Sequence, residues 1–159
     1  PSLSGGTSQD DSPNIRGAFM GLDLAHARSD LIRSAMEGIA MGLRLALDEL
    51  RRLTRIGDEM VMVGGGSRSA FWRQIFADVY NMKVVKTNID QQAAALGAAA
   101  TIAVGLDWWK DFAKIDEIHE VESEILPDPK NKAVYERLLP VFQKAASSQA
   151  ELGDMLEKI

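Results

Sequence analysis

The stretch EMVMVGGGSRSAFWRQIFADVY, residues 59–80, decides how the chain can fold. It begins with a short apolar run at 59–63, breaks on three consecutive glycines at 64–66, and then resumes with apolar residues at helical spacing. These apolar residues are Phe71, Trp72, Ile75, Phe76 and Val79. The pattern predicts a strand, a glycine turn and a helix in succession.

The glycine turn has two interpretations. Backbone N–H groups at the start of a helix point beyond the end of the strand, where they and the helix dipole favour an anion. Glycine also lets the backbone approach a phosphate or a purine, because no Cβ intrudes. A tight turn that needs a positive φ explains the glycines equally well. The motif is neither GxGxxG nor GxxxxGK[ST], so the turn alone does not identify a nucleotide site.

Helical and strand patterns alternate on both sides of this stretch. Residues 16–22 are a strand candidate weakened by glycines. Residues 30–55 carry apolar side chains at i, i+3, i+4 spacing and predict a long amphipathic helix, which Gly57 ends. Residues 82–87 predict a second strand and residues 90–104 a helix of small residues. The order predicts an α/β fold with a largely parallel sheet.

The last part of the chain predicts an acidic, extended segment followed by a helix. Residues 115–129 carry the acidic segment, and an amphipathic helix should begin at Pro129 or Lys130. Pro140 is expected to kink or break this helix, because proline lacks the N–H that a helix interior needs.

Composition excludes several classes of protein. The chain has 159 residues, 46% hydrophobic and 26% charged, which suits one globular domain with a core. A net charge of −5 without a large basic cluster argues against nucleic acid. Cysteine is absent, and His26 and His119 lack zinc-site spacing. The longest apolar run, 93–106, is too short to span a bilayer, and no secretory signal is present.

No catalytic constellation stands out. Asp10 and Asp11 are most simply solvated turn residues. Glutamates at alternate positions of the acidic segment would share one face of a strand, where solvent exposure explains them better than a metal ion does. They are Glu120, Glu122 and Glu124. We therefore assign no catalytic residue and no metal ligand to this chain.

Three segments in order resemble the FGGY family of carbohydrate kinases. GAFMGL at 17–22, followed by DLIRSAME at 30–37, resembles the family's second signature. GGGSRSAFWRQ at 64–74 resembles the GGGxxSxxWRQ segment of its xylulokinases, and ALGAA at 95–99 resembles the segment that follows. PSLSG at 1–5 is similar to a loop that relatives read as PYLSGERTP. Three segments in the right order are far more specific than any one of them.

The resemblance implies a fold and a division of the chain. The family has two actin-like, ribonuclease-H-like ATPase domains with ATP and the sugar between them. Residues 1–126 would be the C-terminal, nucleotide-binding domain without its first strands, and residues 127–159 a C-terminal helical extension. Because the chain starts at Pro1 inside a loop, we expect it to be a fragment.

The resemblance also implies residues and an activity. The expected nucleotide-binding residues are Gly64, Gly65 and Gly66, against the adenosine and the α-phosphate, with Ser67 and Ala70 nearby. ATP with Mg²⁺ would donate its γ-phosphoryl group to a sugar hydroxyl, a xylulose-like pentulose being the first expectation. The catalytic aspartate belongs to the N-terminal domain, so this chain alone should be inactive. A cytoplasmic location and a homodimer are compatible with the family; a membrane or nucleic-acid partner is not expected.

Two departures and two alternatives limit this interpretation. Residues 5–9 read GGTSQ where relatives have GERTP, and Gln92 stands where many relatives have an acid. The substrate therefore stays open, with glycerol, gluconate, ribulose and fuculose as alternatives to a xylulose-like pentulose. Glu37 occupies a signature position, but an ion pair with Arg33 or Arg44 explains it as well. The competing hypotheses are a non-catalytic actin-like nucleotide-binding or assembly module and a structural α/β domain whose turn binds nothing.

Overall fold

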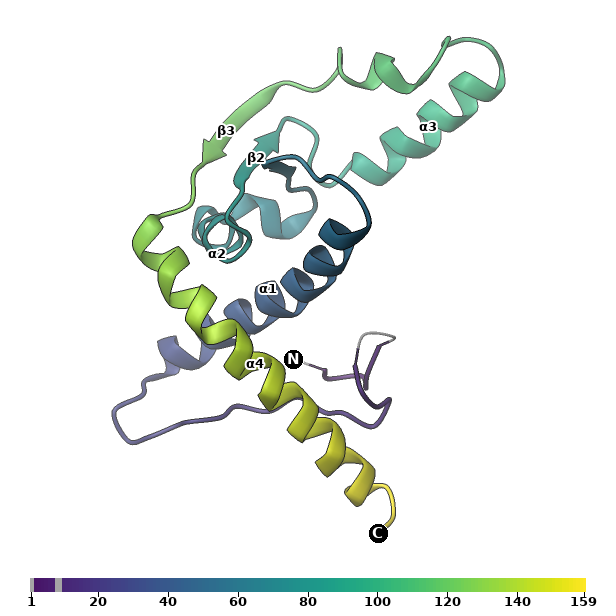
Figure 1. Ribbon diagram of the computed structural model, residues 1–159. Coiled ribbons are helices and arrows are strands. Elements are labelled where there is room, and N and C mark those ends of the chain that lie inside the picture. The colour runs from purple at the N-terminus through teal and green to yellow at the C-terminus, as the bar shows by residue number, and fades with distance from the viewer. Residues whose placement is uncertain (1, 8–9) are drawn as a thin grey trace. The chain divides into compact units, whose positions relative to one another are not determined.

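The computed structural model describes residues 2–7 and 10–159; Ser8 and Gln9, part of the departure from the GERTP loop, lie outside the described residues. The chain divides into two compact units, Pro1–Ile56 with Pro129–Ile159, and Gly57–Asp128. Figure 1 shows the elements in order along the chain. They are α1 (Arg28–Leu53), β1 (Glu59–Val61), the 3₁₀ turn η1 (Gly65–Arg68), α2 (Ala70–Tyr80), β2 (Lys83–Thr87), α3 (Ala93–Gly105), η2 (Phe112–Ile115), β3 (Val121–Ile125) and α4 (Pro129–Leu156).

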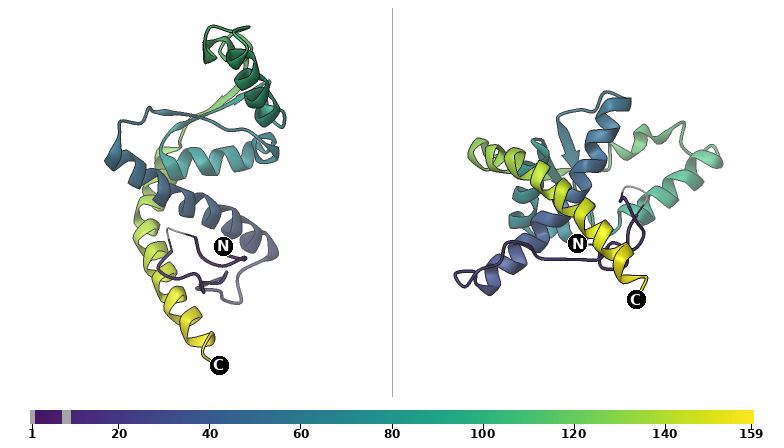
Figure 2. Two further views of the ribbon diagram at one scale, coloured as in Figure 1. Left: turned by 90° about the vertical axis from the view of Figure 1, so that its right-hand side faces the viewer. Right: turned by 60° about the horizontal axis from the view of Figure 1, so that its bottom comes forward.

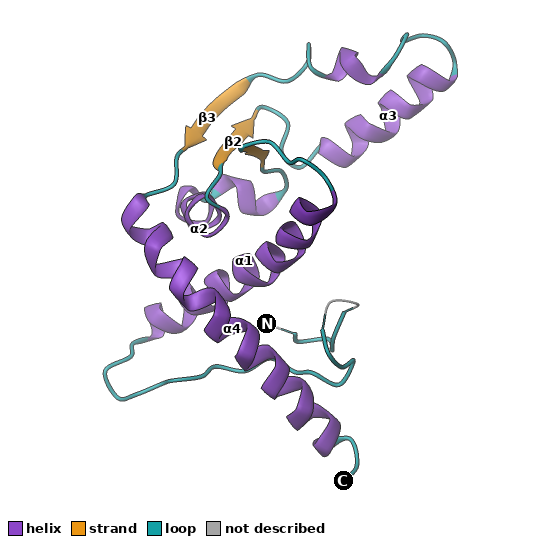
Figure 3. Ribbon diagram, in the orientation of Figure 1, coloured by secondary structure: helices purple, strands orange, loops and turns teal. Residues whose placement is uncertain are grey.

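The Gly57–Asp128 unit is built on a three-stranded sheet in the order β1-β2-β3 (Figure 3). β1 and β2 are parallel, with Met60 opposite Val84, whereas β2 and β3 are antiparallel, with Val85 opposite Glu124. The prediction of a largely parallel sheet is therefore wrong for β3. Its cause is visible in Figure 1, where α3 leads away from the end of β2 and the chain returns through η2 in the opposite direction.

Helix α2 supplies the core of this unit by packing against β2 and β3. Val84 and Val85 of β2 are 0% and 1% exposed, and Ile75 and Val79 of α2 are buried with them. On the sheet, Lys83 Nζ pairs with Glu124 at 2.8 Å and Lys86 pairs with Glu122. Two glutamates of the acidic strand thus form cross-strand ion pairs. This agrees with the expectation that they lie on a solvent-exposed face.

In the other unit, α1 packs against α4, which Figure 2 shows from two further directions. The Tyr135 hydroxyl donates a hydrogen bond to Glu37 at 2.7 Å, and Arg33 Nε donates to the same carboxylate at 2.7 Å. Burial, followed by the hydrogen bond with Glu37, raises the pKa of Tyr135 to about 12. The signature glutamate therefore makes the ion pair with Arg33 that the structural interpretation predicts.

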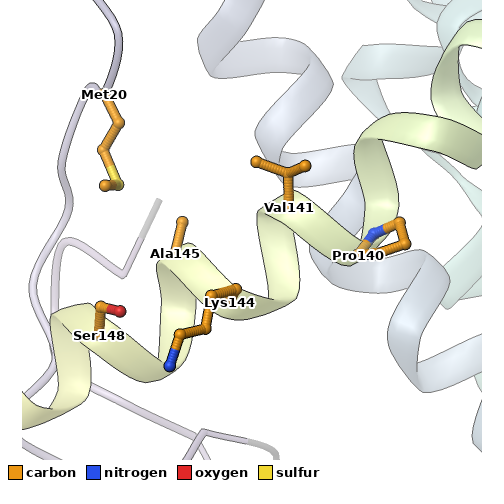
Figure 4. A pocket seen from close by; sticks show the side chains of 6 residues that line it. All are labelled: Met20, Pro140, Val141, Lys144, Ala145 and Ser148. Carbon is orange, nitrogen blue, oxygen red and sulfur yellow. The ribbon is translucent and has the colours of Figure 1, made fainter.

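One sequence prediction fails in this unit, and another is restricted. Residues 16–22 form no strand; they run extended and exposed, with Phe19 at 55%, because no neighbouring strand pairs with them. Pro140 does not end α4, which continues to Leu156. Side chains of α4 near this proline line a cavity of about 370 Å³. Met20 also lines it, and its side chain points toward α4 (Figure 4).

None of the helices in the described part of the chain has both the length and the apolar character that crossing a bilayer requires.

Candidate functional site

The glycine turn begins where the pairing of β1 with β2 ends. Met62 still donates a backbone hydrogen bond to the Val85 carbonyl at 2.9 Å, which extends the strand toward the turn. Gly64 then adopts φ +83° and ψ −174°, a conformation that only glycine occupies without strain. Its N–H donates to the Asp90 carbonyl at 3.1 Å. The turn is therefore fixed to the segment that follows β2.

The residues after Gly64 form a 3₁₀ turn, and the helix begins only afterwards. The predicted order of strand, glycine turn and helix is confirmed, with η1 at Gly65–Arg68 between β1 and α2, which starts at Ala70. Ser69 caps α2 because its Oγ accepts a hydrogen bond from the Trp72 N–H at 3.2 Å. Ser69 has φ −85° and ψ 108°, an extended conformation that separates η1 from α2.

Ser67 closes the turn from inside. It is 0% exposed, and its Oγ and its N–H both donate to the Gly64 carbonyl, at 2.7 and 3.1 Å. The buried Arg73 guanidinium donates to the Ser67 carbonyl. These bonds give the turn a defined shape, and they commit the Ser67 side chain to the turn itself.

The three glycines differ in what surrounds them. A Cβ at Gly66 would lie 3.3 Å from the Trp72 ring and from the Met62 methyl group, so the fold leaves little room there. A Cβ at Gly65 would meet nothing within 4 Å, and Gly65 has no positive φ. The fold itself gives no reason for glycine at position 65, which leaves open space beside an ordered backbone.

The five predicted site residues thus fall into two groups. Gly65 and Ala70 are exposed, and Gly64 and Gly66 are partly exposed, so a ligand has access to their backbone. Ser67 is buried and acts on the shape of the turn. Their assignment to a nucleotide stays a prediction.

Residues outside the predicted set also contact the turn. Arg68 Nε pairs with Asp90 Oδ2 at 2.8 Å. The Arg68 guanidinium, together with the Gln91 N–H, holds the pKa of Asp90 below its usual range. Asp90 lies on a different loop, 22 residues along the chain from Arg68, and no local motif marks the pair.

Two residues near the start of α2 each have a buried side-chain nitrogen atom without a hydrogen-bond partner within the described residues. These atoms are Trp72 Nε1 and Arg73 Nε. In the same residues, no group of three or more histidine, cysteine, aspartate or glutamate side chains is arranged to hold a metal ion. The chemistry offered by the turn is therefore backbone polar groups, open space and one guanidinium, a set suited to an organic anion.

Curated proteins similar to this chain include sugar kinases. The model of the C-terminal domain of the FGGY family of carbohydrate kinases matches residues 1–106. The xylulose kinase of Staphylococcus epidermidis is 31% identical over 167 aligned residues, which cover 98% of this chain and 32% of that protein. The chain spans about a third of the length of the curated relatives it matches.

Solved structures of similar fold include further sugar kinases. The crystal structure of a ligand-bound xylulose kinase from Lactobacillus acidophilus matches with a TM-score of 0.83 and 28% identity, covering 94% of this chain and 30% of that chain. A gluconate kinase from the same species matches with a TM-score of 0.76 and 28% identity, covering 87% and 28%. Both similarities extend over most of this chain and under a third of the other.

Proposed function

Because the chain belongs to the FGGY family of carbohydrate kinases, we propose that it is the nucleotide-binding part of an ATP-dependent sugar kinase. The observation that carries the proposal is the glycine turn itself, where a Cβ at Gly65 would meet nothing within 4 Å and the backbone of Gly64 and Gly66 is partly exposed. An ordered turn with room for a ligand, in the segment that resembles the xylulokinase motif, suits a bound nucleotide.

In this proposal the residues of the turn bind and orient, and the chemistry occurs elsewhere. The backbone of residues 64–66 lies against the adenosine and the α-phosphate, Ala70 borders the site, and Ser67 keeps the turn in shape. ATP supplies the transferred phosphoryl group, with Mg²⁺ as its counterion. We assign no magnesium ligand and no general base to this chain, so the 159 residues alone should not phosphorylate a sugar.

The proposed acceptor is a xylulose-like pentulose, bound together with the N-terminal domain of the full protein. Relatives named xylulose kinase support this choice. A gluconate kinase of equal sequence identity among the structural neighbours keeps gluconate as the substrate to test against it. The proposal also includes a cytoplasmic location and, for the full protein, a homodimer that sedimentation would detect.

We further propose that the chain is the later part of an actin-like domain whose first strands lie outside it. Residues 1–126 would belong to that domain and residues 127–159 to a helical extension. Two features support this. Among the residues that the structure describes, β1 pairs with β2 alone and Val61 is 48% exposed, and residues 16–22 pair with no strand. Both offer free backbone groups to further strands.

Substitution of Gly65→Ala tests the nucleotide site. We expect the variant to fold like the parent chain but to bind ADP about tenfold more weakly, because the added methyl group occupies space that the ligand needs. Isothermal titration gives the affinity and thermal unfolding the stability. Gly42→Ala is the matched control, since a Cβ there also meets nothing within 4 Å.

Three results would count against the proposal. ADP binding that is equally tight in Gly65→Ala would remove the turn from the site. A parent chain that does not bind ADP would refute nucleotide binding by these residues. Sugar-dependent ADP release by the isolated chain would contradict the expectation that the general base lies elsewhere.

A further inference from the structure

Asp90 connects the glycine turn to the loop that precedes α3. Its carbonyl accepts the Gly64 N–H at 3.1 Å, and its carboxylate accepts Arg68 Nε at 2.8 Å. The Gln91 N–H donates to the same carboxylate. One residue therefore fixes the start of the turn through its backbone and the end of the turn through its side chain.

Arg68 keeps most of its hydrogen-bonding capacity. Its side chain is 57% exposed, while that of Asp90 is 13% exposed. Only Nε takes part in the pair, and within the described residues no hydrogen bond uses the two terminal nitrogens of the guanidinium. Because the guanidinium is planar and rigid, the bond at Nε also sets the direction of the remaining N–H groups.

We propose that Arg68 is a phosphate-binding residue of the nucleotide site and that Asp90 is a positioning residue that orients it. The inference rests on the proposed function and deepens it, because neither residue belongs to the nucleotide-binding set assigned above. A guanidinium donates two parallel hydrogen bonds to phosphate oxygens, a geometry that an ammonium group lacks. The ligand class is an adenosine phosphate whose first phosphate groups lie beside Gly65.

The charges of the pair make the proposal specific. Arg68 lowers the pKa of Asp90, so both groups are charged at neutral pH and their charges cancel. The pair therefore attracts phosphate through directed N–H groups more than through net charge. For this reason we expect the contribution of Arg68 to fall only weakly with added salt.

A purely structural ion pair makes a different prediction. Exposed ion pairs contribute little to stability, and their removal leaves a distant ligand unaffected. If Arg68 were a surface residue without contact to the ligand, its loss would change the affinity for neither ADP nor adenosine. If it only shaped the turn, its loss would weaken both ligands equally.

The test compares ADP with adenosine on the 159-residue chain by isothermal titration. We expect Arg68→Gln to bind ADP about tenfold more weakly and adenosine as before, since only ADP carries phosphate. Asp90→Asn should lower ADP affinity by a smaller factor, because its amide still accepts a hydrogen bond but no longer a charge-assisted one. The double variant should match Arg68→Gln alone if Asp90 acts through Arg68.

Arg52→Gln is the matched control, because Arg52 forms an exposed pair with Glu49 at 2.8 Å on α1. It should leave ADP and adenosine binding unchanged, and all variants should keep the melting temperature of the parent.

Each contrary outcome has a separate meaning. If the parent chain binds neither ligand, the proposed function fails and this inference fails with it. If the parent binds ADP and Arg68→Gln binds it equally well, only the inference fails. Equal losses for ADP and adenosine would overturn the phosphate role of Arg68. A further loss from Asp90→Asn in the Arg68→Gln background would overturn the positioning role of Asp90.

Discussion

Two loops of the chain contain glycine for opposite reasons. In the N-terminal loop, of which residues 5–7 and 10–14 are described, a Cβ at Gly6 would lie 2.1 Å from the Ser12 carbonyl oxygen, so the backbone itself fills the space. Gly153 of α4 is similar, since its Cβ would lie 2.2 Å from the Asn14 carbonyl oxygen. At Gly65 nothing lies within 4 Å. Packing requires glycine at the first two positions, whereas at position 65 packing leaves room for a side chain.

The two loops also differ in what holds them. The N-terminal loop depends on α4: Asp154 accepts hydrogen bonds from Ser12 Oγ and from Asn14 Nδ2, the latter at 2.9 Å. Ser147 of the same helix donates to Asp11 at 2.7 Å. The glycine turn depends on Ser67 within it and on Asp90 beyond it. Substitutions should therefore affect the first loop through stability and the second through binding.

Gly153→Ala should have the largest effect on stability. The added methyl group cannot coexist with the Asn14 carbonyl, so the loop must leave α4, and we expect a loss of about 2–3 kcal/mol in the free energy of unfolding. Urea denaturation followed by circular dichroism measures it. Gly42→Ala, an open position within α1, should instead gain up to about 1 kcal/mol from helix propensity. Equal effects of the two substitutions would contradict the contrast between packed and open glycines.

Gly64→Ala should have an intermediate effect. No neighbour blocks its Cβ, but the positive φ is strained for any side chain, and we expect a loss of about 1–2 kcal/mol by the same measurement. Gly65→Ala should leave the free energy of unfolding unchanged. Neither Cβ meets a neighbour, so the difference between the two variants in the free energy of unfolding measures the backbone strain at Gly64. A Gly64→Ala variant as stable as the parent would show that the turn relaxes this strain.

Asp154→Asn should have the smallest effect, visible mainly in acid. Ser12 and then Asn14 hold the pKa of Asp154 below its usual range. A lowered pKa stabilises the fold above the unfolded value of about 3.9 and stops doing so as pH falls through the folded value. The melting temperature of the parent should therefore fall more steeply than that of the variant between about pH 5 and about pH 2. Glu151→Gln, exposed on α4, serves as the control; identical slopes would exclude the interaction.

Local patterns predict the helices and two strands of this chain. The apolar spacing over residues 30–55 is confirmed by α1, and the run at 59–63 by β1, because each pattern depends on one element alone. The direction of β3 depends on where α3 carries the chain, and a strand at 16–22 depends on a partner. The periodicity of apolar residues reveals neither the path of the chain after α3 nor the partner of a strand. Of the two outcomes expected at Pro140, a break does not occur, since a long helix tolerates one missing N–H.

The sequence predicts where the candidate site lies, but not the contacts that hold it in shape. Three glycines between a strand and a helix identify the turn, and the flanking motifs identify its family. The burial of Ser67 and the bonds from Asp90 arise from tertiary contacts. A backbone carbonyl such as that of Asp90 carries no sequence signature at all, so this part of the site needed the structure.

The hydrogen bonds of Ser67, Arg73 and Asp90 order the glycine turn before any ligand binds. Fixing the backbone of one residue costs about 1–2 kcal/mol of conformational entropy. Because the turn is already fixed in the folded chain, this entropy is lost during folding and not during binding. A ligand of the turn would then associate at a rate set by diffusion and orientation, without waiting for a conformational step.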